Sequence, residues 1–220
     1  MSATLHVTED GNWLELLRPQ ARGRADAHPG PALFLDRDGT VIREIGDLHE
    51  PEKVELIPGA GRIIAAANRA GWPVVIVTNQ SGVGRGVFTW ENFAAVQAAV
   101  TAALAAEGAA IDMVLACAYR PETGLGRYRA AHPWRKPGPG MLLTAAKHLS
   151  IELGRSWILG DNVIDIEAGR EAGLAGGLHV LTGHGETYRA RALAAATTRY
   201  RVFGIADIAA APRHIPELEA

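Results

Sequence analysis

The chain has 220 residues, of which 48% are hydrophobic and 21% charged, with a formal net charge of −2. This length suits one folded domain, and the small acidic charge excludes an overall field that would hold nucleic acid or an anionic membrane. The single cysteine excludes an internal disulfide and fits a reducing compartment. Acids near the start oppose a signal peptide, and no apolar run reaches the roughly 20 residues of a membrane span, so we expect a cytoplasmic protein.

The first predicted segment, residues 1–31, differs in composition from the rest of the chain. It contains "RPQARGRADAHPGP", which is rich in Gly, Pro and Arg. Such a composition predicts an arm or a short helix followed by a linker, without a chemical role. We therefore place the domain proper at residues 32–220.

From residue 32 on, apolar runs typical of strands alternate with amphipathic stretches typical of helices. This alternation predicts an α/β fold with a Rossmann-like, doubly wound parallel sheet and helices on both faces. The strands are expected at residues 32–36, 73–78, 111–117, 156–161 and 177–181, which are mostly apolar on both faces. The helices are expected at residues 58–71, 89–108, 163–173 and 185–196, with Thr89 as a helix N-cap.

Polar residues follow several of these strands, at the edge of the sheet where doubly wound folds bind ligands. The stretches "FLDRDGT", "IVTNQSGVGRG" and "ILGDNVIDIEAG" place Asp36, Thr78 and Asp161 there, and "RKPGPGM" adds Lys136 before a further helix. Each residue alone has an ordinary explanation, since Thr-Asn pairs form turns and lysines usually lie at the surface. Together they form a set of carboxylates, a hydroxyl and a fixed cation that suits phosphoryl transfer.

Phosphoryl transfer through an aspartyl phosphate requires a carboxylate nucleophile whose charge is offset by a divalent cation and a fixed positive side chain. Asp36 is the expected nucleophile and shares a Mg²⁺ ion with Asp161, while Lys136 supplies the fixed charge. Asp38 is expected to protonate the leaving oxygen and then to activate water. Thr78 is expected to donate to the transferring oxygens.

The motifs "DRDGT", "TN", the lysine of "RKP" and "GDNVID" resemble, in order and spacing, those of the haloacid dehalogenase superfamily of phosphohydrolases. The longer stretches "FLDRDGTV", "VTNQSGVGRG", "RKPGPGML" and "GDNVIDIEAGREAG" resemble more closely the D-glycero-D-manno-heptose bisphosphate phosphatases and the related histidinol phosphatases. The likeness extends from Ala32 to about Phe203. It implies a Mg²⁺-dependent hydrolase of a phosphorylated sugar that forms an aspartyl phosphate.

The same resemblance implies the roles of further residues. Mg²⁺ would be held by the carboxylates of Asp36 and Asp161 and by the main-chain carbonyl of Asp38, with Asp165 and Asn162 supporting them. The arginines of the "GRG" and "RKP" stretches, Arg85 and Arg135, would bind the substrate. We add the residues that follow the second strand, Asn79, Gln80 and Ser81, to the substrate-binding set.

One departure from the family pattern concerns the long connection at residues 118–134, a length at which loops are often functional. Heptose-type members carry zinc on a Cys-x-His and a Cys-x-Cys pair, whereas this chain reads "CAY" and "HPW" there. Only Cys117 and His132 are left as ligand types, so we do not expect zinc. Instead we expect Tyr119, Tyr128 and Trp134 to hold the loop by packing, with Cys117 buried.

Other readings stay open at the level of the sequence. A histidinol-phosphate phosphatase shares the motifs, and a nucleic-acid 3′-end phosphatase could use Arg120, Arg127 and Arg129, although the net charge opposes it. A non-catalytic phosphometabolite-binding protein would have the same fold. We expect a monomer with a small phosphorylated substrate, and we assign no ligand role to the scattered residues His49, His148, His179 and His184.

The intervals between the motifs also predict the shape of the site. Neither the stretch from Thr40 to Pro58 nor that from Thr78 to Lys136 has room for a cap domain beside its expected elements. We therefore expect an open pocket walled by three loops at residues 43–50, 82–88 and 118–134.

Overall fold

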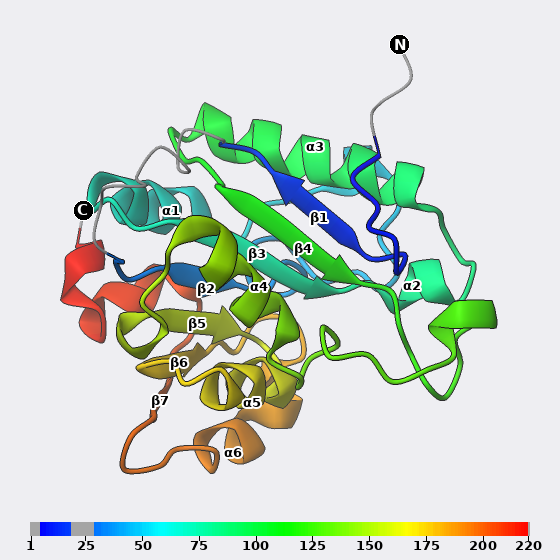
Figure 1. Ribbon diagram of the computed structural model, residues 1–220. Helices are drawn as coiled ribbons and strands as arrows, with labels where there is room; N and C mark the ends of the chain where they lie inside the picture. Colours follow the sequence, from blue (N-terminus) through cyan, green and yellow to red (C-terminus); the bar gives the residue numbers. More distant parts are fainter. Residues whose placement is uncertain (1–4, 19–28, 220) are drawn as a thin grey trace.

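The computed structural model describes residues 5–18 and 29–219, which form a seven-stranded sheet between two layers of helices (Figure 1). The strand order is β1-β4-β3-β2-β5-β6-β7, and all neighbours are parallel except β1, which runs antiparallel to β4. The strands are β1 (Trp13–Leu16), β2 (Leu33–Leu35), β3 (Val74–Asn79), β4 (Met113–Cys117), β5 (Trp157–Gly160), β6 (Gly176–His179) and β7 (Arg201–Gly204). The predicted doubly wound α/β fold is confirmed.

The predicted helices are also present, and the short helix α2 is an addition to them. The helices are α1 (Ala60–Arg69), α2 (Ser81–Gly84), α3 (Trp90–Ala106), α4 (Gly140–Leu149), α5 (Val163–Glu171) and α6 (Gly185–Leu193). Short 3₁₀ helices lie at Pro51–Lys53, Gly126–Tyr128, Leu153–Arg155, Ile208–Arg213 and Pro216–Leu218. The predicted cap of α3 is present, because Thr89 accepts a hydrogen bond from the amide of Asn92 and Asn92 reaches back to the amide of Thr89.

Two apolar layers cover the sheet, one on each face. Successive strand residues point to opposite faces, so Leu33 and Leu35 pack with α1, α3 and the C-terminal 3₁₀ helices, while Phe34 packs with α4, α5 and α6. Because both faces are covered, the polar ends of the central strands are the part of the sheet left open to a ligand.

The N-terminal segment departs from its prediction. Instead of an arm or a short helix, Trp13–Leu16 forms an edge strand beside β4 (Figure 1), with Trp13 1% exposed against Trp90 and Phe93. Strands β1 and β7 were both missed because they lie at the two edges of the sheet and their residues are mostly half-buried or exposed, so neither shows the continuous apolar run by which the central strands were predicted. The part of the expected linker at residues 19–28 lies outside the described residues.

No domain is inserted above the strand ends. The chain between β2 and α1 contains only the 3₁₀ helix Pro51–Lys53, and the chain between β3 and β4 contains only α2 and α3. Residues 29–219 therefore contain no large cap domain, as predicted. Within the described residues no helix combines the length and the apolar character that a membrane crossing requires.

Candidate active site

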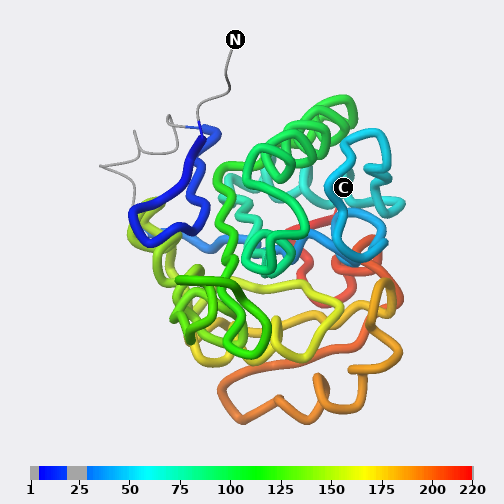
Figure 2. Tube along the Cα trace, turned by 90° about the vertical axis from the view of Figure 1, so that its right-hand side faces the viewer, coloured from blue at the N-terminus to red at the C-terminus, as the bar shows by residue number. Residues whose placement is uncertain are grey.

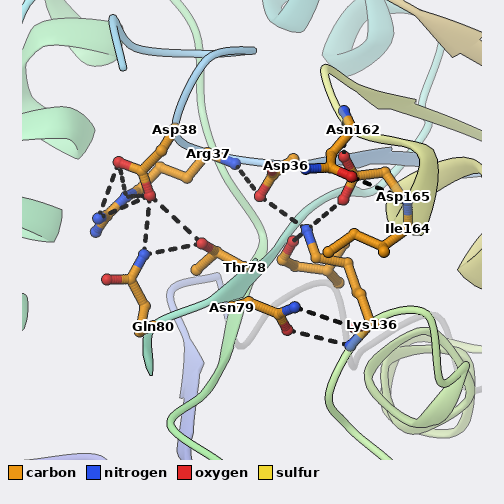
Figure 3. A network of polar contacts seen from close by, with 11 residues as sticks. Asp36, Arg37, Asp38, Thr78, Asn79, Gln80, Lys136, Asn162, Ile164 and Asp165 are labelled. Atoms are coloured by element: carbon orange, nitrogen blue, oxygen red, sulfur yellow. Dashed lines mark hydrogen bonds and ion pairs between the residues drawn. The ribbon is translucent and has the colours of Figure 1, made fainter. Parts of the chain in front are cut away.

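The carboxyl ends of β2, β3 and β5 meet at a pocket of about 420 Å³. Asp36 follows β2, Thr78 and Asn79 end β3, and Asp161 follows β5. Lys136 reaches the same point from the loop before α4 (Figure 3). The structure thus brings together the three strand-end residues Asp36, Thr78 and Asp161 and the lysine that the sequence singled out. We call the inner part of the pocket the floor; it is lined by Asp36, Asp38, Thr78, Lys136 and Asp161, and Asp165 lies fully buried behind them.

Lys136 is the fixed cation of the floor. Its Nζ lies 2.8 Å from Asp36 Oδ1 and 2.6 Å from Asp165 Oδ1, and it donates to the carbonyl of Val77 at 2.7 Å. An ammonium group has three donors, so each has a partner, and the side chain is only 1% exposed. Asp36 Oδ1 also accepts from the Arg37 amide at 2.9 Å, which leaves the carboxylate fixed by one oxygen.

The floor carries more negative than positive charge. Oxygens of Asp36, Asp161 and Asp165 lie within 4.8 Å of one another, around the single ammonium of Lys136. Burial and, to a smaller extent, the neighbouring Asp165 raise the pKa of Asp36 well above its ordinary value and that of Asp161 to about 7. Burial alone would lower the pKa of Lys136, but Asp165 and Asp36 raise it above its ordinary value, so the ammonium stays charged.

These carboxylates fit a divalent cation. Asp165 is already engaged, since one oxygen pairs with Lys136 and the other accepts from the Asn162 amide at 3.0 Å. Asp36 and Asp161 are left with oxygens that can bind a hard cation, and such a cation would offset the excess negative charge. The expected division between the ligands Asp36 and Asp161 and the supporting residue Asp165 stays a prediction.

Two glycines make room for Asp161. Gly39 and Gly183 have φ values of +83° and +58°, and a Cβ at either position would lie 2.3 or 2.1 Å from Asp161 Oδ2. The same oxygen accepts from the His184 amide at 2.7 Å. The glycine of the "DRDGT" motif is thus required for close approach of this carboxylate as well as for the turn.

Asp38 is held on the other side of the floor (Figure 3). Arg37, a side chain that is only 1% exposed, donates to both oxygens of Asp38 and lies over the ring of Phe93. Gln80 donates to Asp38 Oδ2 at 2.9 Å and to the Thr78 hydroxyl at 2.9 Å. The carboxylate expected to transfer protons is therefore oriented by a buried guanidinium and an amide.

The Asn79 side chain holds the backbone of Lys136, so its amide is not free for a ligand. Its Nδ2 donates to the carbonyl of Lys136 and its Oδ1 accepts from the Lys136 amide, both at 3.1 Å. Contact of Asn79 and Gln80 with substrate stays a prediction, because the structure gives their amides contacts with Lys136, Asp38 and Thr78. Ser81 lines the pocket, with Arg120 at 3.5 Å from its hydroxyl.

The mouth of the pocket, which we call the rim, consists of Glu44, Asp47, Arg85, Arg120 and Arg135. Asp47, Arg85 and Arg120 come one each from the three predicted wall loops. Arg85 pairs with Asp47 at 2.6 Å, and Arg135 donates to the carbonyl of Tyr119 at 2.9 Å. Burial raises the pKa of Glu44. The rim thus places several cations above the carboxylates and the ammonium of the floor.

Comparison with known proteins agrees with this geometry. The HAD-hydrolase-like family model matches residues 133–211. A D-glycero-beta-D-manno-heptose-1,7-bisphosphate 7-phosphatase of Mesorhizobium japonicum is 49% identical over 172 residues, which cover 78% of this chain and 77% of that protein. The chain belongs to the HAD-like phosphatase family. It is a phosphatase, as its relatives are.

Solved structures of this family show the same fold. A protein of Mesorhizobium loti described as a HAD-like phosphatase is 41% identical with a TM-score of 0.84, and the match covers 98% of this chain and 97% of that one. A D,D-heptose 1,7-bisphosphate phosphatase of B. bronchiseptica, complexed with magnesium and phosphate, is 29% identical with a TM-score of 0.73. That match covers 86% of this chain and 99% of the other.

The loop at residues 118–134, which we call the pocket loop, distinguishes this HAD-like phosphatase from the zinc-loop pattern described above. Cys117 is fully buried in the core, and burial raises the pKa of its thiol to about 11. Tyr119 stacks on His132 with ring centroids 4.4 Å apart and meets Tyr128 edge to face. Packing of these aromatic residues is as expected, and Trp134 meets His132 edge to face as well. That the loop holds no zinc stays a prediction.

Sequence reasoning missed several residues that line the pocket or support its lining. Arg37 was passed over because arginines are mostly exposed, although its place between two motif aspartates was a signal. Arg120 was considered only for nucleic acid, and Glu44 and Asp47 were not singled out within their wall loop. His184 was set aside as scattered, but it lines the pocket, and its place after β6, at the same edge of the sheet, could have shown this.

Proposed function

We propose that this phosphatase removes one phosphate from a heptose bisphosphate, or a closely similar sugar bisphosphate, through an aspartyl phosphate on Asp36 and with Mg²⁺ as cofactor. The observation that carries the proposal is the pair of Asp36 and Lys136 at the floor of an arginine-rimmed pocket. The names of the relatives support the choice of sugar, and the magnesium and phosphate in the B. bronchiseptica protein support the choice of cofactor.

In the first step Asp36 acts as the nucleophile. Oδ1 is held by Lys136 and by the Arg37 amide, whereas Oδ2 has no hydrogen-bond partner within the described ranges of the chain. A carboxylate oxygen forms the bond to phosphorus while the bond from phosphorus to the sugar oxygen breaks. Asp38 gives its proton to that leaving oxygen.

In the second step water releases the phosphate. Asp38, held by Arg37 and Gln80, takes a proton from water, which attacks phosphorus and breaks the bond to Asp36. Mg²⁺ bound by Asp36, Asp161 and the main-chain carbonyl of Asp38 would offset the charge of the transferring group. Lys136 and the Thr78 hydroxyl add positive potential and a hydrogen-bond donor from the protein itself.

The rim supports a substrate with a second anionic group. Arg85, Arg120 and Arg135 line the same pocket as Asp36, and guanidinium groups match phosphate oxygens geometrically. A distal phosphate bound there would place the reacting phosphate over the floor, and binding energy from the remote end would favour the reaction.

A panel of substrates tests the proposal. We expect kcat/KM for heptose 1,7-bisphosphate to exceed that for histidinol phosphate and p-nitrophenyl phosphate by about 100-fold or more. Each anomer is assayed separately, and DNA with 3′-phosphate ends is included. Faster turnover of histidinol phosphate or of DNA ends would overturn the assignment to a sugar bisphosphate and leave the phosphatase chemistry in place.

Metal analysis tests the cofactor. Activity should be lost in chelator and restored by Mg²⁺, and the purified protein should hold no stoichiometric zinc, because the Tyr119 and Trp134 positions offer no zinc ligand. One zinc per chain would overturn our interpretation of the pocket loop. A monomeric state, the absence of a nucleic-acid partner and a cytoplasmic location stay predictions.

A further inference from the structure

The turn at residues 8–12, which we call the N-terminal turn, is held rigidly by its own hydrogen bonds. The Thr8 amide donates to the Asn12 carbonyl at 2.8 Å, and the Asn12 amide donates to the Thr8 hydroxyl at 3.0 Å. Gly11 has a φ of +85°, and a Cβ there would lie 2.8 Å from the Tyr128 hydroxyl. Trp13, directly after the turn, is buried in the core. Its own hydrogen bonds and the buried residue that follows it thus fix the conformation of the turn.

Several hydrogen bonds join the N-terminal turn to the pocket loop. The amide of Ala118 donates to the buried side chain of Asn12 at 3.2 Å. The hydroxyl of Tyr119 donates to the Asp10 carbonyl at 2.7 Å, and that of Tyr128 donates to the Gly11 carbonyl at 2.9 Å. In Figure 2 the blue N-terminal segment lies beside the green chain that follows β4. The start and the middle of the loop are therefore attached to the turn.

His132 attaches the far end of the loop to the same turn. Its Nε2 lies 2.9 Å from Asp10 Oδ2, and its Nδ1 accepts from the Trp134 amide at 3.1 Å. Because Nδ1 accepts a hydrogen bond, Nε2 carries the proton donated to Asp10. The ring also stacks on Tyr119, so Asp10 orients a histidine that joins two separate parts of the pocket loop.

The attached residues carry two arginines of the rim. Arg135 follows Trp134 directly, and its Nη1 donates to the carbonyl of Tyr119 at 2.9 Å. The amide of Arg120 donates to the carbonyl of Tyr128 at 2.8 Å. Both arginines are therefore positioned by loop residues whose side chains contact the N-terminal turn.

We propose that the N-terminal turn is a positioning element that fixes Arg120 and Arg135 for the distal group of the substrate. This inference rests on the proposed function, in which the rim binds a second phosphate. A long loop without such contacts would lose conformational entropy each time it closed on a ligand, whereas a fixed loop avoids that cost. The turn itself touches no reacting group, so it affects selectivity and not chemistry.

The test is Asp10→Ala, with Glu9→Ala as the matched control. Both changes remove one carboxylate from the same turn, but only the Asp10 side chain contacts His132. Tyr119→Phe is a second variant, which removes the hydroxyl bond to the turn and retains the ring. For each variant we would measure amide hydrogen exchange over residues 118–135, and kcat/KM for heptose bisphosphate and for p-nitrophenyl phosphate.

We expect exchange over residues 118–135 to be about tenfold faster in the Asp10 and Tyr119 variants. The specificity constant for the bisphosphate should fall about three- to tenfold, with p-nitrophenyl phosphate turnover and the Glu9 variant unchanged. Unchanged exchange, or equal losses on both substrates, would overturn the inference. If the wild-type enzyme showed no preference for the bisphosphate, the proposed function would fail. The exchange data would still test whether the N-terminal turn holds the pocket loop in place.

Discussion

The floor and the rim of the pocket are built differently. In the floor, Lys136 and Asp165 are 1% and 0% exposed, and each of their charged atoms has a partner inside the protein. In the rim, Arg85 and Arg120 are 29% and 40% exposed, and each side chain makes one or two contacts with other exposed or half-buried groups. Internal contacts determine the geometry of the floor, whereas the rim leaves donors available to a ligand. We therefore expect changes in the floor to affect chemistry and stability, and changes in the rim to affect substrate choice.

The largest effect is expected from Asp36→Asn. The amide is not a nucleophile and cannot form the aspartyl phosphate, so turnover of every substrate should fall by about 10⁴-fold or more. Steady-state assays with a sugar bisphosphate and with p-nitrophenyl phosphate would measure the loss. A rate within tenfold of wild type on either substrate would exclude covalent catalysis by Asp36.

A smaller loss of rate is expected from Asp38→Asn. Removing the proton carrier should cost about 10²–10⁴-fold. Because p-nitrophenolate leaves without a proton, formation of the phosphoenzyme from that ester should survive better than its hydrolysis. Rapid mixing should then show a burst of p-nitrophenol followed by a slow steady state. Equal slowing of both phases would contradict the role of Asp38 in activating water.

Stability should respond most to Lys136→Met. This change leaves Asp36 and Asp165 buried without their cation, and breaking such a buried pair costs about 3–5 kcal/mol in the free energy of unfolding. Urea unfolding would measure it. Adding Asp165→Asn should restore part of the lost stability but none of the turnover. The double variant thus separates the contribution of the floor to stability from its contribution to catalysis. No recovery in the double variant would mean that Lys136 and Asp165 are not coupled.

In the rim, Arg135→Ala should lower kcat/KM for a sugar bisphosphate about tenfold and leave p-nitrophenyl phosphate turnover almost unchanged. Arg129→Ala is the control, because Arg129 is an exposed arginine of the same loop that does not line the pocket. Equal losses on both substrates would place Arg135 with the floor and contradict the division between the two regions.

The smallest effect concerns pH and metal. Folding raises the pKa of Asp161 from an ordinary 3.8 to about 7, so the metal-free folded state binds more protons than the unfolded chain and loses stability as pH rises through this interval. Mg²⁺ binds the ionised carboxylates, so its gain in Tm should be a few degrees larger at about pH 8 than at about pH 5. Thermal unfolding with Mg²⁺ or chelator would measure this. Asp161→Asn should abolish the difference, and a gain independent of pH would contradict the shift.

The sequence predicted the floor better than the rim for a physical reason. Asp36, Thr78 and Asp161 end strands whose apolar pattern is readable, and parallel strands carry such residues to one edge. The roles of Asn79 and Gln80 were not readable, because their hydrogen bonds depend on how the loops pack. Asn79 bonds to Lys136, which is 57 positions away in the chain. The N-terminal turn was unreadable as well, since its contacts are with residues that follow β4.

The antiparallel pairing of β1 with β4 has a consequence for the order in which the molecule forms. β1 leaves the ribosome before β4, because Ala116, with which Trp13 pairs, is synthesised about a hundred residues later. Until β4 is in place, β1 has no partner strand, and the residues of the N-terminal turn have no pocket loop to contact. A partly synthesised chain that ends before β4 therefore lacks both the pairing of β1 with β4 and the contacts of the N-terminal turn with the pocket loop. We expect these two features to form together, late in folding.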